Sequence, residues 1–366
     1  GVQNTLIGGL AGDAITTGYN NVAVGSDALG ANTTGFGNVS VGANSMITNT
    51  TGANNTATGR YALYSNTTGT NNVAFGLQGL FANTTASNNT AVGYQSLAAN
   101  TTGIENVAVG ALALDALTTG EYNVAVGTSA LSTDTKGGSS TAIGYQALLT
   151  QNSTSEANVY NTAVGRNAGL AVTTGTGNTL IGALTGDAIT TGDSNVQLGY
   201  LTAASAVDVD AEFVIGAGVT GSGGSTITIG SGAGKIYNAF TSNATWTQTS
   251  DERLKKNIVP DTLGLSFINR LETVKYNWKP SNEINESLPY YAEENTRDTT
   301  TVMHGLVAQQ VKEALEAEGV DTFAGWVEGV DGVQGVSREM FISPLIKAIQ
   351  EQQTIIEALT ARITTL

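Results

Sequence analysis

The sequence predicts a mainly β protein, in which a parallel β-solenoid is followed by a small α/β domain that ends in a coiled coil. Three observations predict this fold. A glycine-anchored motif recurs at a fixed spacing through residues 1–216, charged side chains become frequent from residue 250, and residues 340–366 carry a heptad pattern. We therefore expect a rod at 1–216, a neck at 217–249 and a second domain at 250–366.

The rod is predicted by the glycine of the motif "NVAVG", which recurs every 17 residues. The anchors are Gly8, Gly25, Gly42, Gly59, Gly76, Gly93, Gly110, Gly127 and Gly144, followed after one step of 21 residues by Gly165, Gly182, Gly199 and Gly216. The longer step predicts a four-residue insertion near 152–156. Because so small a unit cannot bury its own apolar face, the copies must stack, and thirteen of them predict a rod of roughly 60 Å.

Each copy contains a short β-branched run between turn-forming residues, which indicates a strand. Side chains alternate along a strand, so Val22 and Val24 share one face while Ala23 and Gly25 share the other. We expect the larger face to lie inside the coil. The small face would then allow another sheet or subunit to approach closely.

Composition limits the possible functions. The chain has 366 residues, no Cys and one His, His304, so we expect no disulfide, no metal and no cofactor. A net charge of −15 disfavours nucleic acid as a partner, and the lack of a long apolar run predicts no membrane insertion. The chain starts at Gly1 without an initiator Met or signal peptide, so we expect a fragment from which an N-terminal attachment region is missing.

The second domain differs from the rod in composition. Residues 1–249 hold 12 acidic and 4 basic side chains, whereas residues 250–366 hold 18 and 11 in half the length. The alternation in "VKYNWK" (274–279) predicts a strand, and the spacing of apolar residues in 305–319 predicts a helix that ends at Gly319. The preceding neck contains one more strand-like run, Thr226–Ile229, between flexible glycines.

Residues 340–366 predict a coiled coil of more than three heptads. Its a and d positions are Ile342, Leu345, Ile349, Gln352, Ile356, Leu359, Ile363 and Leu366. Ile at a with Leu at d favours a parallel dimer by the core rules alone, although the polar Gln352 weakens that preference.

The segment "TQTSDERLKKNI" (247–258) opens the second domain with a cluster of charges. Ser250 and Lys255 are a nucleophile and a potential base, and Ser–Lys pairs are a variant of the serine-nucleophile arrangement. A lysine acts as a base only when burial or a nearby cation lowers its pKa from about 10.4. This spacing is common, so local chemistry leaves an ordinary solvated segment open.

The repeats resemble those of known fibrous proteins. The signature in "NNVAVG" (20–25) and "NNTAVG" (88–93) is similar to the β-roll repeats of trimeric autotransporter adhesin heads and to repeats of phage tail fibres. The resemblance implies a trimer of left-handed parallel β-rolls, although the period of 17 is longer than that of the adhesin heads. Because the resemblance implies threefold symmetry, we expect the coiled coil to be a trimer rather than a dimer.

The second domain resembles another family. "SDERLKKNI" (250–258), "YNW" (276–278), "HGLVAQQV" (304–311) and "LIKAIQEQ" (345–352) follow the order of motifs in the intramolecular chaperone of phage tail fibres and tailspikes, peptidase family S74. The resemblance implies that the domain trimerises, guides folding and then cuts itself off. Ser250 would be the nucleophile, Lys255 the base and Thr249–Ser250 the cleaved bond.

For other residues of these motifs, the resemblance implies supporting roles rather than catalytic ones. Asp251 and Arg253 match the S-D-x-R-x-K motif and would orient the loop or bond across the trimer. His304 matches the family's "HG" and is expected to have a structural or trimer-contact role rather than a catalytic one. Lys256 is the neighbouring lysine without an implied role.

The leading hypothesis is a trimeric tail-fibre fragment of a virion with a single-turnover, self-cleaving chaperone. Its partners would be two further copies, a host receptor such as a glycan or outer-membrane component, and a tail or baseplate protein. Two alternatives stay open: a glycan-degrading tailspike, which needs a pair of carboxylates, and a bacterial surface adhesin with the same chaperone.

Overall fold

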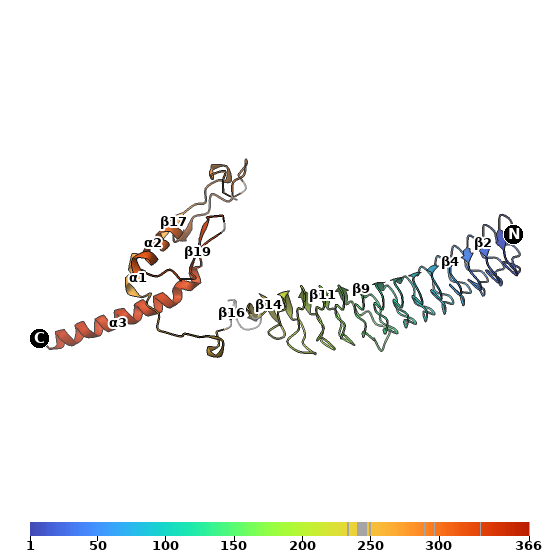
Figure 1. Ribbon diagram of the computed structural model, residues 1–366, viewed down its shortest axis with the longest axis horizontal. Helices are drawn as coiled ribbons and strands as arrows, with labels where there is room; N and C mark the ends of the chain where they lie inside the picture. Colours follow the sequence, from blue (N-terminus) through green and yellow to red (C-terminus); the bar gives the residue numbers. More distant parts are fainter. Residues whose placement is uncertain are drawn as a thin grey trace. The chain divides into compact units, whose positions relative to one another are not determined.

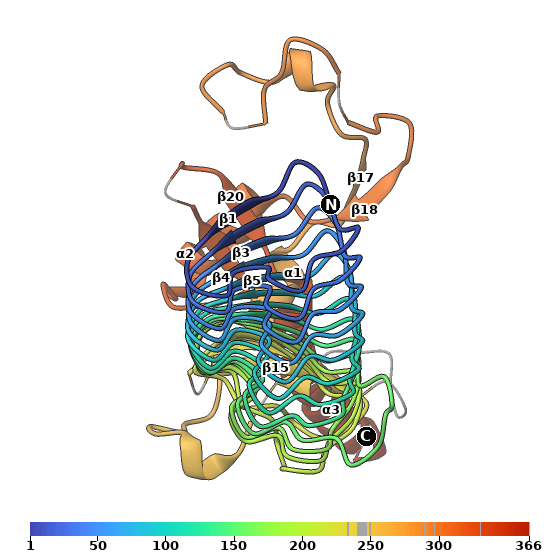
Figure 2. The same ribbon diagram turned by 90° about the vertical axis from the view of Figure 1, so that its right-hand side faces the viewer.

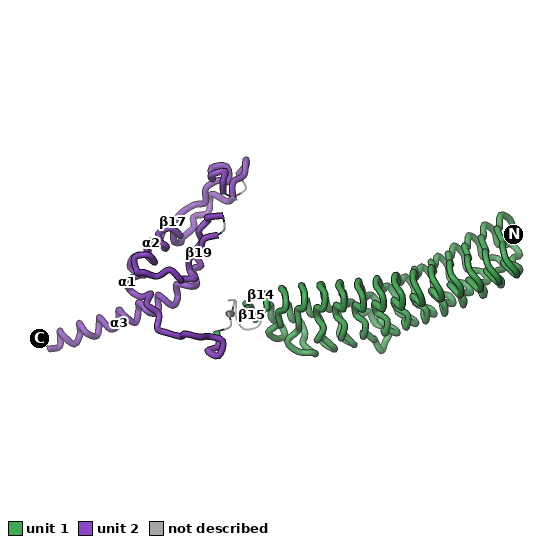
Figure 3. Tube along the Cα trace, viewed as in Figure 1, with its two compact units in different colours: residues 1–250 green, residues 251–366 purple. Residues whose placement is uncertain are grey.

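The computed structural model describes residues 1–232, 234–239, 247–248, 250–288, 290–295, 297–329 and 331–365. Contacts divide the chain into two compact units, Gly1–Ser250 and Asp251–Leu366 (Figure 3). In Figure 1 the first unit is a stack of β coils, and the second carries the helices of the described residues.

The first unit consists of short strands separated by turns. The strands are β1 (Thr5–Ile7), β2 (Val22–Val24), β3 (Val39–Val41), β4 (Thr56–Thr58), β5 (Val73–Phe75), β6 (Thr90–Val92), β7 (Val107–Val109), β8 (Val124–Val126), β9 (Thr141–Ile143), β10 (Thr162–Val164), β11 (Thr179–Ile181), β12 (Val196–Leu198), β13 (Phe213–Ala217), β14 (Thr226–Ser231), β15 (Gly234–Ala239) and β16 (Thr247–Gln248).

These strands form one sheet in sequence order, which confirms the parallel β-solenoid. Each strand from β1 to β13 pairs in parallel with the next, and the pairs β14–β15 and β15–β16 at the end of the sheet are antiparallel. Residues one repeat apart are direct partners, as Val22 is with Val39. Figure 2, viewed along the rod, shows the coils one behind another with the strands on one side.

The predicted orientation of the strand faces is wrong. Ala23 is completely buried inside the coil, whereas Val22 and Val24 on the same strand are partly exposed on the outside. The small residues point inward because each coil is narrow, and Leu29 from the turn already fills its centre beside Ala23 and Ala28. The rod therefore presents a row of β-branched and aromatic side chains outward.

The anchor glycines are required by the stacking distance between coils. Gly25 has a φ of 135°, and a Cβ on this residue would lie 2.6 Å from the carbonyl oxygen of Gly42 in the next coil. Only a residue without a side chain allows this approach. The regular period is therefore a direct consequence of backbone contact between coils.

Buried asparagines connect the coils through a ladder of side-chain hydrogen bonds. Asn38 Nδ2 donates to Asn21 Oδ1 at 3.2 Å and to Gly52 O at 2.9 Å, and its backbone N–H donates to the same Asn21 oxygen at 3.0 Å. Glu212 takes the asparagine position in the last regular coil. Its buried carboxylate accepts backbone N–H groups of Ser205 and Gly223 at 2.9 and 2.7 Å. The asparagine ladder and Glu212 thus stabilise the rod because their buried polar groups are paired, whereas the buried side-chain amide of Gln197 has no partner.

The four-residue insertion lies in a loop between β9 and β10, which still pair directly through Thr141 and Thr162. Buried Asp134 supports this loop. Its carboxylate accepts hydrogen bonds from Gln151 Nε2 at 2.6 Å and from the backbone N–H of Ser153 at 3.2 Å. The insertion therefore leaves the stacking of the strands unchanged.

The second unit is a small α/β domain. Its elements are η1 (Glu252–Leu254), α1 (Leu265–Arg270), β17 (Val274–Tyr276), η2 (Ser281–Glu283), β18 (Met303–Gly305), α2 (Ala308–Glu318), β19 (Trp326–Glu328), β20 (Gln334–Val336), η3 (Arg338–Phe341) and α3 (Ile342–Thr364). Strands β17 and β18 form one antiparallel hairpin, and β19 and β20 form another. Phe267, Phe323 and Phe341 contact one another at the centre of the core.

The structure contains the helices that the sequence predicts in this unit. Helix α2 ends at Gly319, which adopts the left-handed conformation with a φ of 69°. Helix α3 has 23 residues and is compatible with a coiled coil, since Ile349, Ile356 and Ile363 are more than half exposed on a single chain. Leu366, the last predicted d position, lies outside the described residues. No helix among the described residues is long and apolar enough to span a membrane.

Candidate self-cleavage segment and a separate pocket

The predicted cleavage site lies where the two units meet in the sequence. Ser250 is the last residue of the first unit and is exposed, whereas Lys255 belongs to the second unit. Thr249, on the other side of the predicted cleaved bond, lies outside the described residues.

Asp251 and Arg253 shape the backbone immediately after the serine. Asp251 precedes η1 as its N-cap, and its Oδ1 accepts the backbone N–H of Arg253 at 2.9 Å. The same two side chains form a salt bridge in which Arg253 Nη2 and Asp251 Oδ2 are 2.6 Å apart. The Arg253 side-chain hydrogen bond holds the pKa of the Asp251 carboxyl below its ordinary value. Both side chains are solvated, so the pair acts locally by fixing the turn rather than as a source of stability.

Lys255 follows η1 as its C-cap. Its backbone N–H donates to Glu252 O at 3.0 Å, and its own backbone is extended. The Lys255 and Lys256 side chains are both exposed on the single chain. A lysine that takes a proton from serine must be shielded from water or lie beside a cation. Further protein must therefore cover this segment for Lys255 to act as a base.

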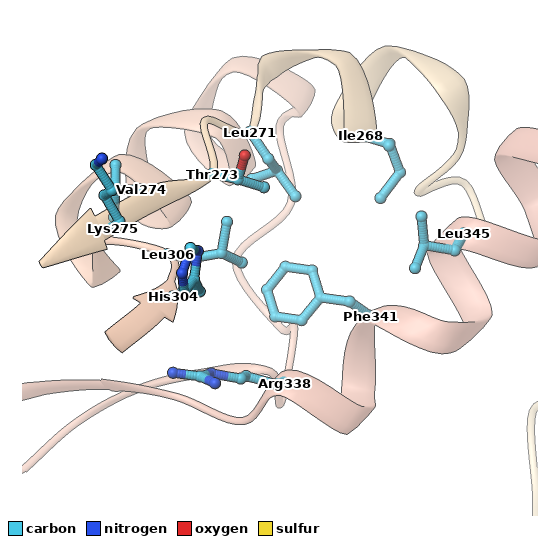
Figure 4. A pocket seen from close by; sticks show the side chains of 11 residues that line it. Ile268, Leu271, Thr273, Val274, Lys275, His304, Leu306, Arg338, Phe341 and Leu345 are labelled. Atoms are coloured by element: carbon cyan, nitrogen blue, oxygen red, sulfur yellow. The ribbon is translucent and has the colours of Figure 1, made fainter. Parts of the chain in front are cut away.

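His304 lies at a separate place in the second unit. It is on β18, directly opposite Lys275 of β17. Both residues border a cavity of about 580 Å³ whose apolar wall contains Leu271, Phe341 and Leu345 (Figure 4). None of Asp251, Arg253 and Lys255 lines this cavity.

The cavity includes cationic residues that the sequence analysis did not select. Arg338 and Lys275 lie at its border with His304 (Figure 4). Leu345, which lines the wall, is also a predicted d position of the coiled coil. The sequence carries no local signal for this cavity because its residues come from three separate segments, 268–275, 304–306 and 338–345.

The described residues contain no group of three or more His, Asp or Glu side chains that could hold a metal ion. Two acidic residues of the rod, Asp193 and Asp210, have structural contacts. Asp193 Oδ1 accepts the backbone N–H of Thr176 at 2.6 Å, and Asp210 Oδ1 accepts that of Asp193 at 2.7 Å. These carboxylates hold turns of adjacent coils together.

A comparison with protein families found a match to the N-terminal part of the second unit. Residues 250–320 match the family model of peptidase S74, described as the chaperone of endosialidase. This segment is similar to the chaperone of endosialidase. Searches of curated proteins and of solved structures returned no match.

The S74 match starts at Ser250 and ends after α2. It includes the Asp251–Arg253 pair, Lys255 and His304, but neither Arg338 nor α3. Together with the solenoid, the S74 segment fits a tail fibre or tailspike with a C-terminal chaperone domain.

Proposed function

We propose that the chain is part of a homotrimeric viral tail fibre, in which residues 250–366 direct trimerisation and folding and then release themselves. The bond between Thr249 and Ser250 is cleaved once. Ser250 attacks the Thr249 carbonyl carbon, Lys255 accepts the serine proton and returns it to the departing amine, and water hydrolyses the ester. The products are a C-terminal carboxylate on Thr249 and a free amine on Ser250.

One observation carries this proposal: the S74 match begins at Ser250, the residue at which the compact solenoid unit ends. A cut before this residue separates the two units and removes only Ser250 from the first one. The fixed turn formed by Asp251 and Arg253 follows at once and limits the conformations of the nucleophile's neighbour.

Trimerisation supplies what the single chain lacks. In the single chain Lys255 is exposed, so a neighbouring copy must provide the covering that a lysine base requires. Cleavage in this proposal follows assembly. A template that brings three chains together also favours correct register in a parallel solenoid, which folds slowly because its strand pairs are distant in sequence.

Two surfaces support association between copies. The outward face of the rod contains Val73, Phe75, Ile143 and Ile181, each more than one third exposed. No charged residue occupies the outward strand positions from β1 to β12. The second surface is the Ile-rich seam of α3. Large uncharged faces of this kind mark interaction sites, and a parallel seam in α3 sets copies of the rod side by side in the same direction.

Mass spectrometry of the freshly expressed chain under denaturing conditions tests the cleavage. The wild type is expected to give fragments of 249 and 117 residues, and Ser250→Ala is expected to stay intact. An uncleaved wild-type trimer would show that residues 250–366 act as a permanent trimeriser. Cleavage of the Ser250→Ala variant at the same bond would remove serine as the nucleophile.

The proposed fibre is part of the virion and attaches it to a host receptor. A bacterial surface adhesin with the same chaperone is the second candidate, since the solenoid and the S74 segment suit either location. Glycan degradation is not proposed, because Asp134, Asp193, Asp210 and Glu212 accept backbone hydrogen bonds within the rod. Expression in either host context leaves the mass-spectrometry test unchanged.

A further inference from the structure

One place on the rod departs from the repeat in several ways at once. In most copies of the repeat, the residues one, two and five positions after the anchor glycine are small or polar. After Gly59 these positions are Arg60, Tyr61 and Tyr64, and five positions after Gly76 stands Phe81. In a solenoid, the repeat residues maintain stacking, so concentrated departures from the repeat are candidates for binding.

The aromatic side chains form one continuous platform. Tyr64 and Phe81 stack with ring centroids 5.1 Å apart and planes inclined by 13°. Tyr61 meets Tyr64 edge-on at 5.6 Å and Phe81 at 6.4 Å. All three side chains are partly exposed, so part of this aromatic surface is open to solvent.

Arg60 lies on the platform as an exposed cation. Its guanidinium carbon is 4.5 Å from the Tyr61 ring centroid, and Nη2 donates to Tyr61 Oη at 2.8 Å. Arg60 is the single basic residue in 1–135. Within the described residues, none of the salt bridges involves it. Because a guanidinium has five N–H donors, Arg60 keeps donors for an anionic ligand.

Amide side chains continue the cluster into the following coils. Gln78 occupies the position of Tyr61 one coil further on, and its backbone N–H donates to Arg60 O at 3.1 Å. Gln95 Nε2 donates to Gln78 Oε1 at 2.9 Å, and both side chains are partly exposed. The pair offers donors and acceptors next to the aromatic rings.

We infer that this platform binds a glycan that carries a carboxylate. The flat C–H face of a sugar ring packs on stacked aromatic rings, Arg60 pairs with the carboxylate, and the Gln78–Gln95 pair hydrogen-bonds hydroxyl groups. The inference rests on the proposed attachment function and assigns it to a place on the rod.

The repeat itself supplies substitutions that preserve the fold. Arg60→Ala and Tyr61→Asn install the residues found at the same positions in the preceding coil, Ala43 and Asn44. Phe81→Ala installs the residue of the following coil, Ala98. Tyr122→Ala is the control, because Tyr122 is 49% exposed and lies elsewhere on the rod.

Calorimetric titration of the purified full chain tests the inference, with sialyllactose and trigalacturonate as acidic probes and lactose as the neutral one. We expect at least one acidic probe to bind, Arg60→Ala to weaken it at least about tenfold, and Tyr122→Ala to leave it unchanged. Phe81→Ala is expected to weaken the acidic and neutral probes alike. A chain that binds neither acidic probe, or variants that bind like wild type, would overturn the inference.

The same samples separate this inference from the proposed function. Trimer formation and cleavage are measured on each variant by light scattering and mass spectrometry. Normal assembly and cleavage without probe binding would overturn only the glycan platform. Specific probe binding by a chain that neither trimerises nor cleaves would overturn the fibre proposal and leave the platform in place.

Discussion

The carboxylate of Glu351, on α3, accepts a hydrogen bond at 2.7 Å from the backbone N–H of Leu265, the first residue of α1. Gly264 provides no side-chain cap for this helix, and a Cβ there would lie 2.4 Å from Glu351 Oε2. A residue of the predicted coiled coil thus caps a helix of the core of the second unit from 86 residues away. Glu351 lies off the a and d positions, so its cap and the seam of α3 can be tested separately.

Glu351→Gln is expected to lower the thermal stability of the second unit at neutral pH and to flatten its dependence on acid. The Leu265 backbone hydrogen bond, followed by Lys347, lowers the pKa of Glu351. A lowered pKa in the folded state contributes stability that is present above the unfolded value of about 4.3 and disappears as pH falls through the folded one. Thermal melts between pH 2 and 7 measure this difference, and exposed Glu316→Gln is the charge-matched control. Equal pH profiles for wild type and Glu351→Gln would show that the cap contributes nothing.

Gly93→Ala is expected to destabilise the rod by at least about 2 kcal/mol. Gly93 has a φ of 140°, and an added Cβ would lie 2.5 Å from Gly110 O in the next coil. Gly79→Ala is the control, since its nearest neighbour would be at 3.6 Å and the repeat carries Ala62 at that position. Chemical unfolding of the two variants compares them. Similar losses would mean that contact between coils is not what selects glycine at the anchor.

Ile349→Asp is expected to abolish the trimer and, with it, cleavage at Thr249–Ser250. The side chain is 64% exposed on one chain, and a charge at an a position cannot be buried in a seam without a large free-energy cost. Thr354→Asp, at an outward f position, is the control and should assemble normally. Sedimentation velocity measures the oligomer. A cleaved monomer of Ile349→Asp would contradict the idea that assembly precedes cleavage.

Val109→Glu tests the outward face of the rod. Val109 lies in β7 on the partly exposed side, while its neighbour Ala108 is buried in the coil. We expect the charge to weaken association between rods without unfolding the coil, so that limited proteolysis of the cleaved fibre becomes faster. Thr102→Glu, in an exposed turn, should behave like wild type. Unchanged proteolysis of Val109→Glu would place the interface on another face.

Lys255→Ala is expected to lower the rate of cleavage at least about a hundredfold, because a general base accelerates a reaction by a factor of this order. Lys256→Ala is the matched control one residue away and should cleave at the wild-type rate. A time course of intact and cleaved chain by mass spectrometry measures both. If Lys256→Ala stopped cleavage and Lys255→Ala did not, the base would be the neighbouring lysine.

Sequence alone was sufficient for the features that depend on local repetition. The step from Gly25 to Gly42 and onward predicted the parallel stacking, since backbone contact between coils recurs at the same spacing. Helix α2 with its end at Gly319 and the helix that carries Ile349 also followed from local pattern. The motif that starts at Ser250 is present in the sequence itself, and the family model matches from the same residue.

Tertiary structure decided which strand face lies inside. The alternation of side chains places Val22 and Ala23 on opposite faces but does not say which face is buried. The buried face depends on how much space Leu29 leaves inside the closed coil. Tertiary structure also determines the Arg60 platform, because Tyr64 and Phe81 come together only when successive coils stack. It likewise determines the cavity beside His304. Such sites join residues from separate segments, so their physical cause is packing between segments rather than any local sequence pattern.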